Sequence, residues 1–185
     1  MADIDRLLHD IFGFPGFRGV QRAVIERVMA GADTLAVMPT GAGKSLCYQL
    51  PALARPGTGL VISPLIALME DQVRSATAMG IRAAALTSAS EDRLGVVNRF
   101  RDGQLDLLYV APERASTDGF RRMIEDRPLA LVAIDEAHCV SEWGHDFRPD
   151  YRLLRPLLDG LGGVPRLALT ATADKVTRAD VLAQL

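Results

Sequence analysis

The sequence contains few cysteines, no long apolar run and no surplus of positive charge. Its two cysteines, Cys47 and Cys139, lie far apart and form no C-x-x-C pair, so neither a zinc site nor a disulfide framework is indicated. The longest strand-like apolar run, Leu129–Ile134, is far too short to cross a bilayer, and residues 1–5 lack the basic start of a secretory signal. We therefore expect no membrane partner and a reducing, cytoplasmic setting, at the nucleoid if the chain is bacterial.

Charge is balanced rather than basic, because 21 Lys and Arg stand against 23 Asp and Glu, for a net charge of -2. This balance does not suggest a wide basic surface, so any contact with nucleic acid must be local. It is weak evidence against a chain that does nothing but bind nucleic acid. A length of 185 residues, with 49% hydrophobic and 24% charged residues, is typical of one ordinary globular domain with a substantial core.

Short apolar runs alternate with helical patterns along the chain, which predicts an α/β fold with a parallel central sheet and helices on both faces. The runs are continuously apolar, as expected of strands that are covered on both sides. Ligands of such sheets bind beyond the carboxyl ends of the strands. We expect strands at 34–38, 59–63, 83–86, 105–110, 129–134 and 166–170, and helices near 2–12, 21–30, 44–54, 65–79, 90–101, 117–126, 148–160 and after 173.

The most informative stretch is 35–45, a strand-like run followed by a glycine-rich turn, Lys44, Ser45 and a helical pattern. This order is typical of a phosphate-binding loop, in which glycines let successive N–H groups point at one anion and the helix start adds its own. Lys44 can then contact the β and γ phosphates, and the Ser45 hydroxyl can bind Mg²⁺. The strict pattern would have glycine at position 38, where this chain has Met38. The alternative is a glycine-rich turn that happens to precede a lysine.

A second motif places two carboxylates, Asp135 and Glu136, directly after the apolar run 129–134. In a parallel sheet they would share the edge that carries Lys44, where Asp135 could hold Mg²⁺ through water and Glu136 could activate the attacking water. The alternative is a solvated acidic pair at a strand end. We expect His138 to follow on a loop, where it could link the nucleotide site to a moving part.

Two further segments leave their interpretation open from the residues alone. The turn-rich stretch 12–21 holds three aromatics, an arginine and a glutamine. These side chains could stack on adenine and pair with its edge, but they could equally pack in the hydrophobic core. The strand 166–170 ends in Thr170-Ala171-Thr172, whose hydroxyls could bond to Asp135, His138 or water, although β-propensity alone also explains them.

A loop directly behind the two carboxylates holds Trp143, His145, Phe147 and Arg148. Aromatic rings with an arginine suit stacking on single-stranded bases, which contributes about 1 to 3 kcal/mol per base. Packing in the core is a plausible alternative for Phe147, but less so for the chain's single tryptophan, which is flanked by Glu142 and Gly144.

Taken in order, these motifs resemble the first RecA-like lobe of helicases, specifically the RecQ family of DNA helicases. Residues 38–49 resemble the family's phosphate loop, Met38 included, and 135–151 resemble its aromatic-rich loop, which DEAD-type RNA helicases lack. Residues 12–21 resemble its adenine-recognition motif, with Gly19 where the family often has proline, and this favours the functional interpretation of that stretch. The nucleotide-binding residues that the resemblance implies are Phe14, Arg18, Gln21, Thr40, Gly41, Ala42, Gly43, Lys44 and Ser45.

The resemblance also implies catalytic and DNA-contacting residues. Lys44, Asp135, Glu136 and His138 are the expected catalytic residues, and Ser45 and Asp135 the expected Mg²⁺ ligands, through water. Residues 61–73 and 109–114 resemble helicase motifs that touch the DNA backbone, and Thr87 with Ser88 is a further candidate; such contacts position without specifying sequence. The expected DNA-binding or coupling residues are Pro64, Gln72, Thr87, Pro112, Trp143, His145, Phe147, Arg148, Thr170 and Thr172.

The resemblance covers residues 1–185, which we interpret as one helicase ATP-binding domain that uses ATP and Mg²⁺. It implies as partners single-stranded or duplex-junction DNA and a second RecA-like lobe; that lobe, the zinc-binding domain and the winged-helix domain do not follow in this sequence. Because the second lobe supplies an arginine finger, its absence could cost about 10³ or more in rate, so we expect weak nucleotide binding and no unwinding by this chain alone. The alternatives are a free-standing nucleotide- or partner-binding module and the lobe of an RNA-remodelling ATPase.

Overall fold

The structure, a computed structural model, describes residues 3–39, 43–87, 92–142, 147–171 and 174–185. Within them a six-stranded parallel sheet has the order β1-β6-β5-β2-β4-β3. The strands are β1 (Thr34–Val37), β2 (Thr58–Ile62), β3 (Ala83–Leu86), β4 (Leu107–Val110), β5 (Leu129–Ile134) and β6 (Arg166–Thr170). All six expected strands are therefore present, three with the expected bounds and three with ends that differ by one or two residues.

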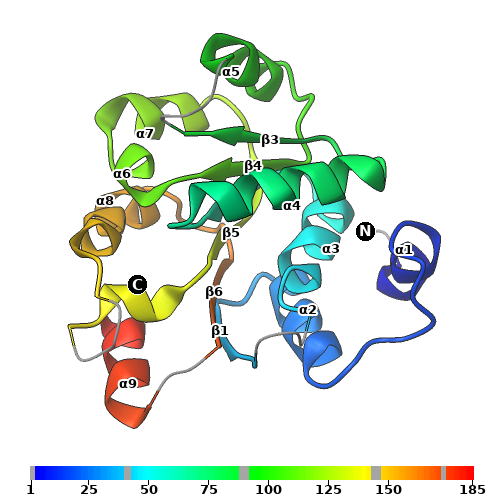
Figure 1. The fold of residues 1–185 in the computed structure, drawn as a ribbon, viewed down its shortest axis with the longest axis horizontal. Coiled ribbons are helices and arrows are strands. Elements are labelled where there is room, and N and C mark those ends of the chain that lie inside the picture. Colours follow the sequence, from blue (N-terminus) through cyan, green and yellow to red (C-terminus); the bar gives the residue numbers. More distant parts are fainter. Residues whose placement is uncertain (1–2, 40–42, 88–91, 143–146, 172–173) are drawn as a thin grey trace.

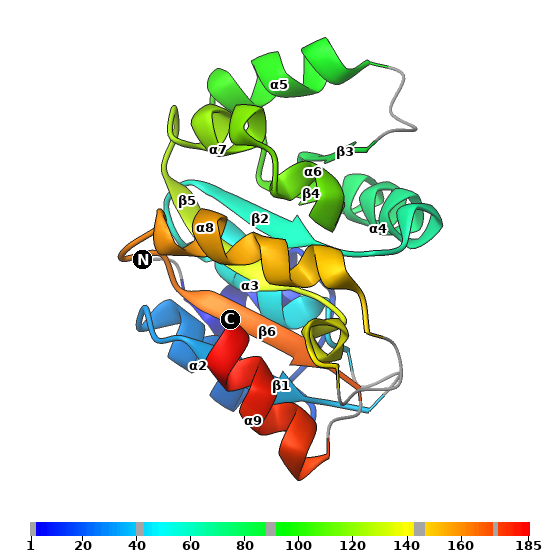
Figure 2. The ribbon, with the colours of Figure 1, turned by 90° about the vertical axis from the view of Figure 1, so that its left-hand side faces the viewer.

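Helices cover both faces of the sheet, as the continuous apolar strands predict (Figure 1). One face carries α1 (Ile4–Asp10), α2 (Gln21–Met29), α3 (Leu46–Ala54) and α4 (Ile66–Ala78). The other carries α5 (Arg93–Arg101), α6 (Pro112–Ala115), α7 (Asp118–Ile124), the 3-10 turns η1 (Ala137–Val140) and η2 (Pro149–Leu154), α8 (Arg155–Asp159) and α9 (Lys175–Gln184). Of these, α8 and α9 are seen in front of the sheet in Figure 2. Every residue of β2, β4 and β5 is buried between these layers.

Two expectations about local structure are wrong. The helix expected over 148–160 is a 3-10 turn followed by the short α8, and each piece begins with a proline at its first or second position. Proline suits the start of a helix but lacks the N–H that a continuing helix needs, which explains the interruption. His138 lies in η1 and is 4% exposed, rather than on an open loop.

No helix among the described residues is long and apolar enough to span a membrane.

Candidate nucleotide site

The carboxyl ends of β1, β6, β5 and β2 form one edge of the sheet, and the predicted nucleotide motifs leave from it. The parallel register pairs Val37 with Thr170 and Ile62 with Ile134, so these strands end side by side. One residue beyond these last strand pairs, the hydrogen bonding continues. The Met38 N–H donates to the Thr170 carbonyl at 2.9 Å, and the Asp135 N–H donates to the Ile62 carbonyl at 2.9 Å. The segment after β1 and the acids after β5 therefore share one edge.

The described part of the phosphate loop consists of Gly43, Lys44 and Ser45, while Thr40, Gly41 and Ala42 lie outside the described residues. Gly43 has φ +74°, which is the left-handed region that favours glycine. Ser45 stands at the N-cap of α3 without capping it through its side chain, so its hydroxyl is not committed to the helix end.

Met38 stands where the strict phosphate-loop pattern has glycine, and its side chain belongs to the core. It is 1% exposed, and the Cys47 Sγ lies 3.8 Å from its Sδ. Burial raises the pKa of the Cys47 thiol to about 12, so this cysteine stays protonated. Methionine at position 38 therefore packs in the core against α3.

A cavity of about 320 Å³ lies between the stretch 12–21 and the start of α3. Its lining includes Phe14, Arg18, Gln21, Gly43 and Ser45, so the aromatic stretch and the phosphate loop face one space. Phe14 is 50% exposed, which leaves its ring accessible. Ligand pockets of proteins commonly measure about 300 to 1,000 Å³, and a flat base beside an exposed ring fits this one.

Gln21 joins the two walls of this cavity. It is 3% exposed, its Oε1 accepts the Arg18 N–H at 2.8 Å, and its Nε2 donates to the Gly43 carbonyl at 3.2 Å. The amide expected to read the base edge is thus bonded within the protein in this structure. Each of these two groups has capacity for a second hydrogen bond, because Nε2 carries two N–H donors and Oε1 two lone pairs.

Burial and neighbouring charges act together on the Asp135 carboxylate. Burial, and then the negative charge of Glu136, raise the pKa of Asp135, whereas the positive charge of Lys44 and the Glu136 N–H lower it. The opposing influence of Lys44 indicates that its ammonium lies close enough to act on this carboxylate. A desolvated carboxylate beside a second one is short of positive charge, so the Asp135 site suits a divalent cation.

His138 is connected to both the acid pair and the end of β6. Its Nδ1 lies 2.8 Å from the Thr170 Oγ1, and its Nε2 lies 3.6 Å from the Glu136 Oε2. The structure therefore brings together three of the predicted site residues in one chain of contacts. Thr172 lies outside the described residues.

The residues expected to contact or couple to DNA are only partly accessible. Pro64 and Gln72 are half-buried near the carboxyl end of β2 and on α4, but Thr87 and Pro112 are buried. A DNA strand could not touch the side chains of Thr87 and Pro112 without a local rearrangement. Trp143 and His145 lie outside the described residues.

Phe147 and Arg148 are half-buried and held against neighbouring segments. The guanidinium of Arg152 lies 5.4 Å from the centre of the Phe147 ring, and the Arg148 N–H donates to the Cys139 carbonyl at 2.8 Å. Both residues therefore belong to a segment that is fastened to η1.

Three buried tyrosines near the edge were not predicted as site residues. The hydroxyls of Tyr48 and Tyr109 lie 3.1 Å apart, and burial raises the pKa of each, so both stay neutral. Tyr151 donates its hydroxyl to the Asp135 carbonyl at 2.7 Å. Tyr48 could have been predicted, because it follows Lys44 by four residues on a predicted helix and so lies on the same helix face. No local sequence pattern links Tyr151 to Asp135.

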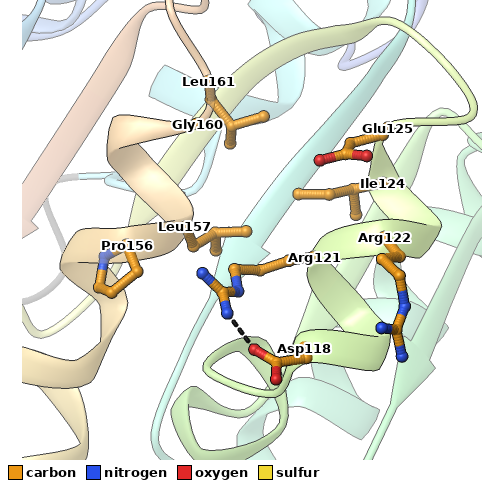
Figure 3. A pocket seen from close by; sticks show the side chains of 9 residues that line it. All are labelled: Asp118, Arg121, Arg122, Ile124, Glu125, Pro156, Leu157, Gly160 and Leu161. Atoms are coloured by element: carbon orange, nitrogen blue, oxygen red, sulfur yellow. Dashed lines mark hydrogen bonds and ion pairs between the residues drawn. The ribbon is translucent and has the colours of Figure 1, made fainter.

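A separate cavity of about 340 Å³ lies between α7 and α8 (Figure 3). Its charged lining includes Arg121, which pairs with Asp118, together with Arg122 and Glu125. None of the predicted site residues lines it. Charges of both signs and apolar residues of α8 share its wall, so it favours no particular class of ligand.

The fold and edge define a RecA-like helicase lobe, and comparisons with known proteins agree. A family profile described as DEAD/DEAH box helicase matches residues 18–180, and the chain belongs to that family. The ATP-dependent DNA helicase RecQ of Pasteurella multocida is 49% identical over 97% of this chain, which covers 29% of that protein. The ATP-dependent helicase SGS1 of Saccharomyces cerevisiae is 44% identical over 96% of this chain, which covers 13% of it.

Solved structures show the same fold at lower identity. The Mycobacterium smegmatis helicase Lhr, determined with ssDNA and AMP-PNP, matches 92% of this chain and 24% of its own, with a TM-score of 0.70 and 22% identity. The helicase domain of Pyrococcus furiosus Hef matches 96% of this chain and 37% of its own, with a TM-score of 0.70 and 20% identity. The chain thus corresponds to one part of considerably longer helicases.

Proposed function

We propose that this chain is the ATP-binding lobe of a 3′-to-5′ ATP-dependent DNA helicase of the RecQ type. The observation that carries the proposal is the shared carboxyl edge, from which the segment leading to Gly43–Ser45 and the Asp135–Glu136 pair both leave. A cavity lined by the stretch 12–21 opens beside that edge. Phosphate, metal and base would each meet a suitable group there.

The roles of the residues follow from their chemistry. Phe14 and Arg18 would stack on adenine, and the side-chain amide of Gln21 would read its edge. Residues 40–45 would hold the phosphates, with Lys44 neutralising charge on the β and γ groups.

Ser45 and Asp135 would hold Mg²⁺ through water, and the metal would neutralise charge that builds up on the phosphates. Glu136 would orient the attacking water, and His138 with Thr170 would relay the state of the site to the rest of the lobe.

Several features support DNA rather than RNA as the partner. The relative that is 49% identical to this chain is named a DNA helicase, and the relative that is 44% identical is named a helicase. The segment 135–151 resembles the RecQ aromatic-rich loop, and its aromatics with Arg148 suit single-stranded bases at a duplex junction. Pro64 and Gln72 would contact the DNA backbone directly, and Thr87 and Pro112 would do so after a local rearrangement. The protein would be localised in the cytoplasm and associated with the nucleoid.

A motor of this class needs a second lobe, because its catalytic cleft forms between two lobes and an arginine from the second stabilises charge in the transition state. We therefore propose that residues 1–185 form one domain that binds nucleotide alone but unwinds DNA only with a second lobe. Zinc-binding and winged-helix domains would belong to the longer protein.

The test compares ATP hydrolysis with single-stranded DNA and with single-stranded RNA, using this lobe joined to the second lobe of a RecQ relative. We expect stimulation by DNA well above that by RNA. Equal or stronger stimulation by RNA would support an RNA-remodelling ATPase instead. Nucleotide binding without any hydrolysis in the joined protein would support a free-standing binding module.

A further inference from the structure

The hydroxyl of Tyr151 holds the backbone of the acid pair. Tyr151 lies in η2, is fully buried, and donates to the Asp135 carbonyl at 2.7 Å. The Asp135 N–H makes the last ladder bond, to Ile62. Its carbonyl therefore lies just past the sheet, and Tyr151 supplies a donor there from a segment sixteen residues away.

The next residue, Glu136, is strained. Its φ of 53° is the only positive φ at a non-glycine residue among the described parts of the chain. A residue other than glycine in this region costs about 1 to 3 kcal/mol and persists only where neighbouring contacts hold it. The backbone at the acid pair therefore needs an anchor.

The peptide between Asp135 and Glu136 is anchored on both sides. Tyr151 binds its carbonyl at 2.7 Å, and the Asp135 Oδ1 accepts its N–H at 2.9 Å. Rotation of this peptide would break the Tyr151 bond, and it would move the N–H to which the Asp135 carboxylate is bonded. The orientation of the peptide thus determines where the carboxylate points.

The segment that carries Tyr151 is fastened to η1 by two more hydrogen bonds. The Arg148 N–H donates to the Cys139 carbonyl at 2.8 Å, and the Arg152 Nε donates to the Val140 carbonyl at 3.0 Å. Residues 135–140 and 147–152 therefore form one bonded unit. A displacement of 147–152 would reach the acid pair through Tyr151.

We propose that Tyr151 is a positioning residue that sets the orientation of the Asp135 carboxylate through the Asp135–Glu136 peptide. This inference rests on the proposed function, in which Asp135 helps to hold Mg²⁺. It goes further in naming a residue that touches neither nucleotide nor metal. It also provides a physical connection between the segment 147–152 and the nucleotide site.

The test uses Tyr151→Phe, which removes only the hydroxyl, and Thr58→Val as the matched control. Thr58 is also buried and also donates a hydroxyl to a backbone carbonyl at 2.7 Å, that of Leu105, at the opposite end of β2. Fluorescent ATP is titrated into this chain and both variants, once with Mg²⁺ and once with EDTA. The quantity compared is the gain in ATP affinity that Mg²⁺ brings.

We expect Tyr151→Phe to lose about 10-fold of this gain, as variants of residues that orient metal ligands do, while its affinity in EDTA stays that of the parent. Thr58→Val should keep both values, although both variants lose thermal stability to a similar degree. A full Mg²⁺ gain in Tyr151→Phe would overturn the inference. A parent that binds no ATP in either buffer would overturn the proposed function itself, and a parent that binds ATP without a Mg²⁺ gain would remove the metal role of Asp135 and this inference with it.

Discussion

Replacing Gly43 by alanine tests the geometry that joins the phosphate loop to the adenine stretch. Alanine at φ +74° costs about 1 to 2 kcal/mol because its Cβ crowds the following carbonyl. The new Cβ would also overlap the Nε2 of Gln21 and lie 3.3 Å from a guanidinium nitrogen of Arg18. Gln21 then has to move, and it loses bonds to the Gly43 carbonyl and the Arg18 N–H in a buried place.

Disturbing these bonds of a buried amide costs a further 1 to 3 kcal/mol or so, which gives about 2 to 5 kcal/mol in all. Gly31→Ala is the matched control, because Gly31 has φ +83° and open space around its Cβ position, so only the backbone cost of about 1 to 2 kcal/mol remains. Urea unfolding followed by circular dichroism measures both free energies. ATP affinity should fall in Gly43→Ala and stay unchanged in Gly31→Ala. If the two variants lose equal stability, the packing of Gln21 against Gly43 does not hold.

Three further substitutions test separate parts of the site. Asp135→Asn should stabilise the chain at neutral pH by roughly 0.5 to 2 kcal/mol in thermal melts, at the expense of Mg²⁺-dependent ATP binding. Because the pKa of Asp135 is raised in the folded state, this gain in stability should shrink as the pH falls through that pKa towards about 4. A gain that grows in acid would refute the prediction. Phe14→Ala should weaken ATP about 2- to 10-fold in competition titrations without weakening tripolyphosphate, since the half-exposed ring contacts only the base; equal losses for both ligands would count against adenine stacking. His138→Ala and Thr170→Val should show a coupling of at least about 0.5 kcal/mol in a double-mutant unfolding cycle, and additive losses would mean that their 2.8 Å contact contributes nothing.

Much of the fold could be predicted because its strands are continuous apolar runs between glycine, proline and polar breaks. Leu129–Ile134 is buried along its whole length, as its composition indicates. The rule that parallel strands present ligands at their carboxyl ends is sufficient to predict Lys44 and Asp135 on one edge. Of the glycine turn, the structure describes Gly43, whose φ of +74° is what local chemistry predicts for a glycine in a tight turn.

The parts that could not be predicted depend on contacts between distant segments. Periodicity does not reveal that Gln21 bonds to Gly43, that Glu136 is strained, or that Tyr151 reaches the Asp135 carbonyl. It also does not reveal that Thr87 is buried, since a threonine after a strand can face solvent or core with the same pattern. These features arise from side-chain direction and packing, which are set only when the layers assemble.

The central claim is that Lys44 and the acid pair share one edge that holds a triphosphate. Its most direct test is ATP affinity with Mg²⁺ in Lys44→Ala beside Lys175→Ala, which removes the chain's only other lysine, at the start of α9. We predict that Lys44→Ala loses ATP binding by at least about 10-fold, while Lys175→Ala binds as the parent does. Equal affinity in all three proteins would contradict the claim.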